Sequence, residues 1–333
     1  MKMNIYSKLH ALSDRIPISV YLGITKQKLI LPFYHTVTNV PKPHLKHLSY
    51  YRTKDDFEKD VYFFKKHFNS ISISALGLKI KRPSFHITFD DGLSDIMTEA
   101  VPFLVSNKIH ATFFINSDFV DNKYMFYRHK VSVILYYLEN KELLKKTSKF
   151  LNIKTCQVID YLINLEYKDN KHIDLIALNL SIDFDEYLKN NKPYLTSTQI
   201  LELIGLGFTI GNHGKSHPNF DGIDLDDQMK EVVSGTDFLN TFPFKIKDNY
   251  FSFPFGSDNR SNEFYKFLYK TNKVCFSFGV SGLKRDEQKR HFHRTEMEYV
   301  GINGSSIIKF EYFYYLIKAI FNKNTLKRVG DEW

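Results

Sequence analysis

The run His86-Ile87-Thr88-Phe89-Asp90-Asp91-Gly92 joins a short β-favouring stretch to two adjacent carboxylates and a glycine. Side chains alternate along a strand, so neighbouring aspartates at its end point in different directions and can do different work. One carboxylate could bind a metal ion while the other moves a proton. Asp-Asp-Gly is also a common turn sequence, and this plain structural interpretation stays open on the motif alone.

A second candidate site lies in the run Gly211-Asn212-His213-Gly214-Lys215-Ser216-His217-Pro218. Two histidines four positions apart can face one side of a helical turn or a compact loop. Imidazole nitrogens suit zinc, and Asp91 would complete a three-ligand set that leaves coordination positions open for water and substrate. The alternative is a pair of exposed loop histidines, and Pro218 argues against a long helix continuing there.

Helical and strand-like stretches alternate around the first run. Apolar residues recur at helical spacing over 54–68, where Thr53 can cap the helix, and again over 94–107. Short apolar stretches at 85–89 and 111–115 are typical of strands. This alternation predicts an α/β fold with a parallel sheet or barrel. The candidate residues follow strands, which would place them at the carboxyl edge of the sheet.

Three ordered runs resemble the motifs of one family. Thr88-Phe89-Asp90-Asp91-Gly92 is similar to the first motif of the polysaccharide deacetylases, the carbohydrate esterases of family 4 that share a NodB-homology domain. Residues 213–217 resemble the second, metal-binding motif, and Phe251-Ser252-Phe253-Pro254-Phe255-Gly256 resembles the third, Pro-aromatic-Gly motif. The resemblance covers roughly residues 28–117 and 195–300, and it implies a distorted (β/α)7 barrel.

The run Leu29-Ile30-Leu31-Pro32-Phe33-Tyr34-His35-Thr36-Val37 adds a clue to the mechanism. It resembles the start of a branch of the family that deacetylates poly-N-acetylglucosamine, in which a Tyr-His pair precedes the Asp-Asp motif. That branch is circularly permuted, and the resemblance implies that His35 is the catalytic acid. An ordinary histidine at a strand end is the alternative.

The resemblance implies metal-assisted hydrolysis of N-acetyl groups, or of O-acetyl groups, on a polysaccharide or glycan precursor. It assigns a divalent metal to Asp91, His213 and His217, with Zn2+ as the first expectation and Co2+, Ni2+ or Fe2+ as alternatives. Such an ion lowers the pKa of a bound water toward about 7. Asp90 would be the general base, as positioned carboxylates often are.

The third motif supplies the remaining roles. Pro254 and Phe255 would contact the substrate, and the Phe255 backbone N–H would stabilise the oxyanion together with the metal. The arginine that usually orients the catalytic aspartate is replaced here by Ser252. Arg294 could supply this charge from another strand.

Two further departures separate this chain from the family pattern. The second motif usually has Ser or Thr after its first histidine, where Gly214 stands, and Ser216 is a candidate to replace the lost hydrogen bond. The tryptophan-containing fourth motif is not visible, since the only tryptophan is Trp333.

The sequence divides into an N-terminal arm, residues 1–27, and a barrel domain, residues 28–333, with an insertion at 118–194. The insertion has helix-like runs and no glycine, which predicts a mostly helical segment. Tyr124, Tyr127, Arg128 and His129 near its start are candidates to line the substrate cleft; simple packing is the alternative.

Composition limits the other classes of function. The net charge of +9 fits anionic glycans, membranes or nucleic acid, but no interleaved basic and aromatic strand motif favours a nucleic-acid binder. The two cysteines, Cys156 and Cys275, show no metal-ligand spacing. No signal peptide or membrane helix is evident, so a cytoplasmic location is expected.

An acetylated glycan is therefore the expected partner, and a peripheral membrane contact or a lipid-linked sugar stays open. The oligomeric state is not determined by the sequence. Two rival functions also stay open: a non-catalytic glycan-binding relative with the same barrel, and a metal-dependent amidohydrolase that acts on a small non-sugar substrate.

Overall fold

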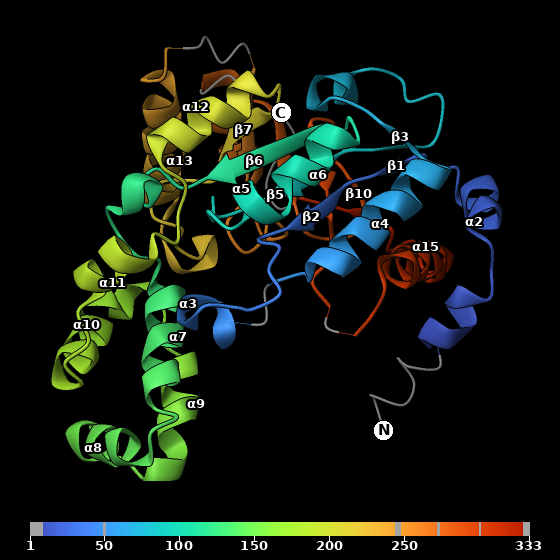
Figure 1. Cartoon of the computed structure of the whole chain (residues 1–333). Coiled ribbons are helices and arrows are strands. Elements are labelled where there is room, and N and C mark those ends of the chain that lie inside the picture. The colour runs from blue at the N-terminus through green and yellow to red at the C-terminus, as the bar shows by residue number, and fades with distance from the viewer. Residues whose placement is uncertain (1–8, 49–50, 244–247, 272–273, 300, 329–333) are drawn as a thin grey trace.

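An eight-stranded parallel sheet, curved into a nearly closed barrel, forms the centre of the computed structural model (Figure 1). The expected α/β barrel of the NodB type is therefore confirmed. Trp333 and the start of the expected arm lie outside the described residues. The structure describes residues 9–48, 51–243, 248–271, 274–299 and 301–328.

Every pair of neighbours in this sheet is parallel, as expected for strands joined by helical connections. Their carboxyl ends therefore meet at one rim of the barrel. In spatial order the strands are β11 (His291–His293), β9 (Val274–Gly279), β8 (Asn249–Ser252), β7 (Thr209–Asn212), β6 (Ala111–Ile115), β5 (Ile87–Phe89), β2 (Pro32–Tyr34) and β12 (Thr295–Glu296).

One continuous segment brings the two ends of the sheet together. β11 pairs with β9 and β12 pairs with β2, and only Arg294 separates β11 from β12. The Arg294 N–H donates to the Gly279 carbonyl (3.0 Å), and the next N–H, of Thr295, donates to the Leu31 carbonyl (2.9 Å). If β11 and β12 are counted as one continuous segment, the barrel has seven positions around its wall, which agrees with the expected seven-stranded barrel.

Two of the predicted strands are split into shorter pieces. The first strand is interrupted at Leu31, and the second at His86, whose two ring nitrogens lie 2.8 Å from the Ile71 carbonyl and the Thr112 hydroxyl. The outer pieces form a small parallel sheet below the barrel strands. The short strands outside the barrel are β1 (Leu29–Ile30), β3 (Asn69–Ser70), β4 (Ser84–Phe85), β10 (Arg285–Asp286) and β13 (Thr325–Leu326).

Helices cover the outside of the barrel, and their ends follow the capping signals of the sequence. Thr53 Oγ1 accepts from the Asp56 N–H at the start of α4 (Lys54–His67). Thr196 forms a capping box with Gln199 at the start of α12 (Ser197–Gly205). The helix predicted over 94–107 is instead two short helices. Its junction lies just before Pro102, which has no N–H to continue the hydrogen-bond ladder.

The remaining helices complete the structure of the described residues. Around the barrel and at its amino end lie α2 (Ile18–Thr25), α3 (Pro43–Lys46), α4 (Lys54–His67), α5 (Ile96–Glu99), α6 (Val101–Ser106), α12 (Ser197–Gly205), α13 (Leu225–Asn240), α14 (Asn262–Lys266) and α15 (Gly304–Ile320). Between β6 and β7 lie α7 (Tyr127–Tyr137), α8 (Lys141–Leu151), α9 (Val158–Ile163), α10 (Asn170–Asn179) and α11 (Phe184–Asn191).

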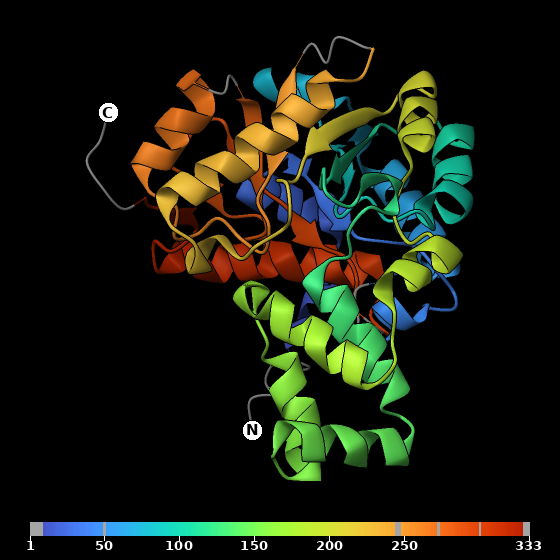
Figure 2. The ribbon, with the colours of Figure 1, turned by 90° about the vertical axis from the view of Figure 1, so that its left-hand side faces the viewer.

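The helices α7 to α11 form a group that projects from the barrel (Figure 2). Buried residues such as Ile134, Leu162 and Ile176 give this group an apolar cluster distinct from the barrel cluster around Phe89 and Phe113. The two groups meet where α3 packs against α7. Among the described residues, no helix is both long and apolar enough to cross a bilayer.

Candidate active site

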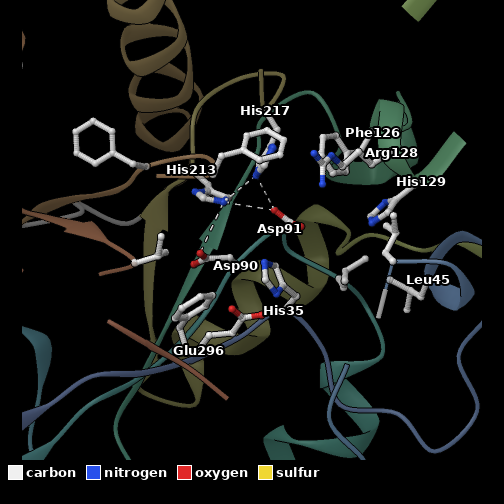
Figure 3. A pocket seen from close by; sticks show the side chains of 16 residues that line it. His35, Leu45, Asp90, Asp91, Phe126, Arg128, His129, His213, His217 and Glu296 are labelled. Atoms are coloured by element: carbon white, nitrogen blue, oxygen red, sulfur yellow. Dashed lines mark hydrogen bonds and ion pairs between the residues drawn. The ribbon is translucent and has the colours of Figure 1, made fainter. Parts of the chain in front are cut away.

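A pocket of about 160 Å3 opens at the carboxyl rim of the barrel (Figure 3). A cavity of about 150 Å3 accepts a benzene-sized ligand, so this one has room for an acetamido group. Its polar lining includes His35, Asp90, Asp91, His213 and His217, which come from three different strand ends.

The turn after β5 sends the two aspartates in different directions. The Asp90 N–H donates to the Tyr34 carbonyl (2.9 Å), which continues the strand pairing. Asp91 then takes a left-handed backbone conformation, with φ at 67°, and Gly92 follows at 62°. A side chain at Gly92 would also press on Ile115, since its Cβ would lie 3.0 Å from Cγ2. Glycine therefore suits this position on two counts.

Asp91, His213 and His217 converge on one point. Asp91 Oδ1 lies 3.4 Å from His213 Nε2 and 3.2 Å from His217 Nε2, and the two Nε2 atoms are 3.2 Å apart. All three side chains are buried, and Asp91 Oδ1 accepts no hydrogen bond from the described residues. A buried carboxylate oxygen without a donor, facing two imidazole nitrogens, is the donor set of a site for a borderline metal such as zinc.

A backbone contact fixes the orientation of one imidazole. His213 Nδ1 lies 2.8 Å from the Ser252 carbonyl, so Nδ1 carries the proton and donates it. The lone pair of Nε2 then faces Asp91 and His217, which is the arrangement that a metal-binding histidine needs. The histidines hold the pKa of Asp91 well below its usual range, although burial by itself would raise it.

Arg294 holds the other aspartate. Its two Nη atoms lie 2.7 Å from the two carboxylate oxygens of Asp90, a bidentate pair, and Nη2 also donates to Ser252 Oγ (2.7 Å). Burial by itself would raise the pKa of Asp90, but the Arg294 charge outweighs it and lowers the pKa. Asp90 is therefore an oriented anion beside the three converging ligand groups.

His35 faces the aspartates from the end of β2 (Figure 3). Glu298, which does not line the pocket, holds its ring. His35 Nδ1 lies 2.5 Å from Glu298 Oε2, while Glu298 Oε1 accepts from the backbone N–H groups of His35 and Thr36. Burial by itself would lower the pKa of His35, but the Glu298 carboxylate outweighs it and raises the pKa to about 10. His35 is thus cationic at neutral pH.

Phe255 lies at the rim of the pocket in a left-handed conformation, with φ at 59°. Its ring packs edge-on against His217, at 5.0 Å between centroids. Among the described residues its backbone N–H has no acceptor, so this donor is available to a ligand. Pro254 precedes it and is buried.

A family model matches the part of the chain that contains most of these site residues. The family model for polysaccharide deacetylase matches residues 78–266, more than half of the chain. The chain belongs to the polysaccharide deacetylase family. The matched range includes Asp90, Asp91, His213 and His217, whereas His35 and Arg294 lie outside it. No curated protein matches the sequence.

Solved structures of deacetylases share the fold. The Streptococcus pyogenes deacetylase PplD in complex with acetate has a TM-score of 0.54 and 13% identity, over 85% of this chain and 98% of that one. IcaB from Ammonifex degensii has a TM-score of 0.53 and 13% identity, over 86% and 97%. A de-N-acetylase from Aggregatibacter actinomycetemcomitans has a TM-score of 0.53 and 13% identity, over 85% and 99%. At this identity the likeness carries the fold alone, and the circularly permuted branch stays a prediction.

The departure from the family pattern at Gly214 has a structural setting. Gly214 has φ at 87°, and its N–H donates to Asn212 Oδ1 (2.7 Å). Glu231 on α13 holds the rest of the loop by accepting from the backbone N–H groups of Lys215 and Ser216 and from the Ser216 hydroxyl. A carboxylate from a neighbouring helix therefore supports the loop that carries His213 and His217.

Two carboxylates that hold site residues, Glu231 and Glu298, could not be predicted from a sequence motif. Glu231 and Glu298 lie in helical and irregular stretches without a motif, and only their partners reveal them. Of the four cleft candidates, Arg128 and His129 line the pocket. Tyr127 is buried and does not line it, and Tyr124 is largely exposed and lines another cavity.

A second group of metal-type ligands lies near the other end of the barrel. Asp286, His291 and His293 are close together, but Arg328 pairs with Asp286, and His291 lies within hydrogen-bond distance of two hydroxyls. The arginine already supplies the positive charge that a cation would bring, so we interpret this group as a structural ion-pair network.

Proposed function

We propose that this family member is a metal-dependent deacetylase that hydrolyses N-acetyl groups on a glycan. The observation that carries the proposal is the convergence of Asp91, His213 and His217 beside the oriented Asp90 and opposite the cationic His35. A bound divalent ion, with zinc favoured by the mixed imidazole and carboxylate donors, would supply Lewis-acid activation of water and of the acetyl carbonyl.

Asp90 is suited to the role of general base. Its carboxylate is buried and ionised, and Arg294 fixes both oxygens so that the side chain does not need to reorganise during proton transfer. The water proton passes to Asp90 while the water oxygen bonds to the acetyl carbon. Ser252 Oγ lies 3.3 Å from Asp90 Oδ2 and supports this orientation.

His35 and Phe255 would complete the reaction on the other side of the scissile bond. The Phe255 N–H donates to the developing oxyanion, and His35 gives its proton to the leaving amine nitrogen as the carbon–nitrogen bond breaks. The products are acetate and a free amino sugar. An O-acetyl ester would need less from His35, because an alkoxide leaves more easily than an amide anion.

Two other functions are distinguishable by experiment. A glycan-binding relative without catalysis would bind acetylated glycans and release no acetate. A small-molecule amidohydrolase is favoured by the apolar part of the pocket wall, which includes Leu45, Leu93, Phe126 and Val280. We also propose that residues 118–194 form an insertion of this domain that contributes this wall through Phe126.

The test is acetate release across a panel of N- and O-acetylated glycans and small acetamides, with the metal content of the protein measured in parallel. Asp90→Asn is the control, since it keeps the shape of the side chain and removes the base. We expect N-acetylated sugars to be the best substrates and the variant to be inactive. Equal release by Asp90→Asn would contradict the base assignment.

A further inference from the structure

A second cavity adjoins the catalytic pocket and differs from it in chemistry. It has a volume of about 250 Å3 and lies between the α3 region and helices α7 and α9. Six of its lining residues are aliphatic, namely Leu48, Val131, Leu135, Leu162, Ile163 and Leu165. We refer to it as the apolar cavity. A groove that binds sugar rings presents hydrogen-bonding groups, and this lining offers few.

Arg128 and Leu48 line both cavities, so the two spaces meet at these residues. Figure 3 shows Arg128 beside Phe126, on the side of the catalytic pocket away from Asp90. The guanidinium stacks over the Phe255 ring at 4.7 Å from its centroid. Arg128 therefore lies where the pocket that contains Asp91, His213 and His217 meets the apolar cavity.

The charge of Arg128 has no acidic partner among the described residues. No carboxylate of these residues lies within ion-pair distance of it, and Nε donates to the Tyr127 hydroxyl (3.3 Å). The four buried arginines, in contrast, each pair with an aspartate: Arg52 with Asp60, Arg260 with Asp221, Arg294 with Asp90 and Arg328 with Asp286. An unpaired, half-buried guanidinium at a cavity junction is suited to a phosphate, which it can bind with two parallel hydrogen bonds.

The outer side of α9, next to the apolar cavity, presents apolar side chains to solvent. Ile159, Tyr161 and Ile163 are exposed by 40%, 37% and 55%, while Val158 and Leu162 on the same helix are buried. Ile163 both lines the apolar cavity and reaches solvent. A hydrocarbon chain in the cavity could therefore continue outward over this surface.

From these observations we propose that the substrate is lipid-linked: an N-acetyl sugar joined through a phosphate to a hydrocarbon chain. The sugar occupies the catalytic pocket, Arg128 binds the phosphate, and the apolar cavity holds the first part of the chain. This proposal deepens the deacetylase function and rests on it for the place of the sugar. The binding of the phosphate and hydrocarbon can be measured without catalysis.

The first experiment titrates the full chain with farnesyl phosphate by calorimetry. We expect Arg128→Met to weaken binding at least tenfold, and Arg290→Met to leave it unchanged. Arg290 is the matched control, because its guanidinium stacks over Tyr269 at 4.3 Å but lines neither cavity. Farnesol and inorganic phosphate should each bind at least tenfold more weakly than farnesyl phosphate. Equal binding of either would overturn the proposal.

The second experiment tests the hydrocarbon. Ile163→Glu places a charge in the apolar cavity at a largely exposed position, so the fold should tolerate it. Ile159→Glu is its control, on the same helix but outside the lining. We expect only Ile163→Glu to weaken farnesyl phosphate binding. Equal affinities of both variants and the unmodified protein would contradict the assignment of the cavity.

The third experiment compares acetate release from N-acetylglucosamine carried on farnesyl diphosphate, N-acetylglucosamine 1-phosphate and neutral chitin oligomers. We expect the lipid-linked sugar to have the highest kcat/KM, and Arg128→Met to raise KM at least tenfold more for the two phosphorylated substrates than for the neutral oligomers. Efficient turnover of the neutral oligomers with no gain from the lipid would refute the lipid-linked substrate. Release from none of them, with farnesyl phosphate still bound, would instead count against the deacetylase function.

Discussion

Arg294 on the segment that closes the barrel holds both carboxylate oxygens of Asp90 at 2.7 Å. The pair joins residues that are 204 positions apart in the chain. We expect Arg294→Ala to lower kcat about 100-fold, since a small displacement of a catalytic group has this effect. Removing one partner of a buried ion pair also costs about 3–5 kcal/mol in the free energy of unfolding.

The matched variant Arg294→Lys separates position from charge. It keeps the cation and much of the stability but loses the bidentate geometry. The acid limb of the profile of kcat/KM against pH should move upward in both variants, because Arg294 lowers the pKa of Asp90. Unchanged turnover in Arg294→Ala would remove Arg294 from the mechanism.

Metal binding should depend on His217 and be independent of a nearby exposed histidine. We expect His217→Ala to lose bound zinc, measured by elemental analysis, and to lose the rise in Tm that added zinc gives the unmodified protein. A ligand at 100 times its Kd stabilises a protein by about 2.7 kcal/mol. His47→Ala is the control, since His47 lies outside the converging ligand group. Full zinc content in His217→Ala would contradict the ligand assignment.

Glu298 should set the alkaline limit of activity through His35. The Glu298 carboxylate opposes the effect of burial and raises the pKa of His35 to about 10, so His35 stays protonated up to that pH. In Glu298→Gln the pKa falls, and the acid form is lost at lower pH. The alkaline limb of kcat/KM should therefore shift downward by about one pH unit or more.

Glu296→Gln is the control for this experiment, because Glu296 lines the pocket and makes no hydrogen bond to His35 in the described structure. Its alkaline limb should stay close to that of the unmodified protein. A downward shift of the same size in both variants would show that the general field of the pocket acts, rather than the contact between His35 and Glu298.

Restoring the usual family residue at Gly214 should harm the protein. The backbone there has φ at 87°, and a Cβ would lie 3.2 Å from Glu231 Oε2. We expect Gly214→Ser to lower the free energy of unfolding by about 1–2 kcal/mol, the cost of a left-handed conformation for a residue with a side chain. Gly205→Ser, which has open space around it, is the control for denaturant titrations. Improved stability in Gly214→Ser would contradict this account.

His86 should make the protein less stable in mild acid. Burial lowers its pKa to about 4, below the usual value of about 6.5. Between these two values the unfolded chain binds the proton more readily, so stability falls as the pH drops from about 6.5 toward 4. The expected loss from His86 between pH 7.5 and pH 5 is about 2 kcal/mol.

The variant His86→Gln can keep hydrogen bonds to Ile71 and Thr112 and does not titrate. Urea titrations at several pH values should give a flatter dependence for this variant than for the unmodified protein. Parallel curves would show that another group controls the acid sensitivity.

The sequence by itself determined the parts that depend on near neighbours in the chain. Helical periodicity and the caps at Thr53 and Thr196 set α4 and α12, because a helix satisfies its hydrogen bonds within one segment. The break before Pro102 is also local, although the apolar pattern alone masked it. Asp91 and His213 could be predicted to meet because each follows a strand, and parallel strands end at one rim. His217 was predicted from its spacing to His213 and from the family motif.

Only the tertiary structure decided which charges meet. Arg294 was a hypothesis until the closing segment placed it against Asp90, and Glu298 and Glu231 had no signal in the sequence at all. Arg128 became a candidate phosphate ligand only because no acid lies near it among the described residues. Such relationships depend on distances across the barrel, which several strands and helices set jointly, so no stretch of the chain encodes them alone.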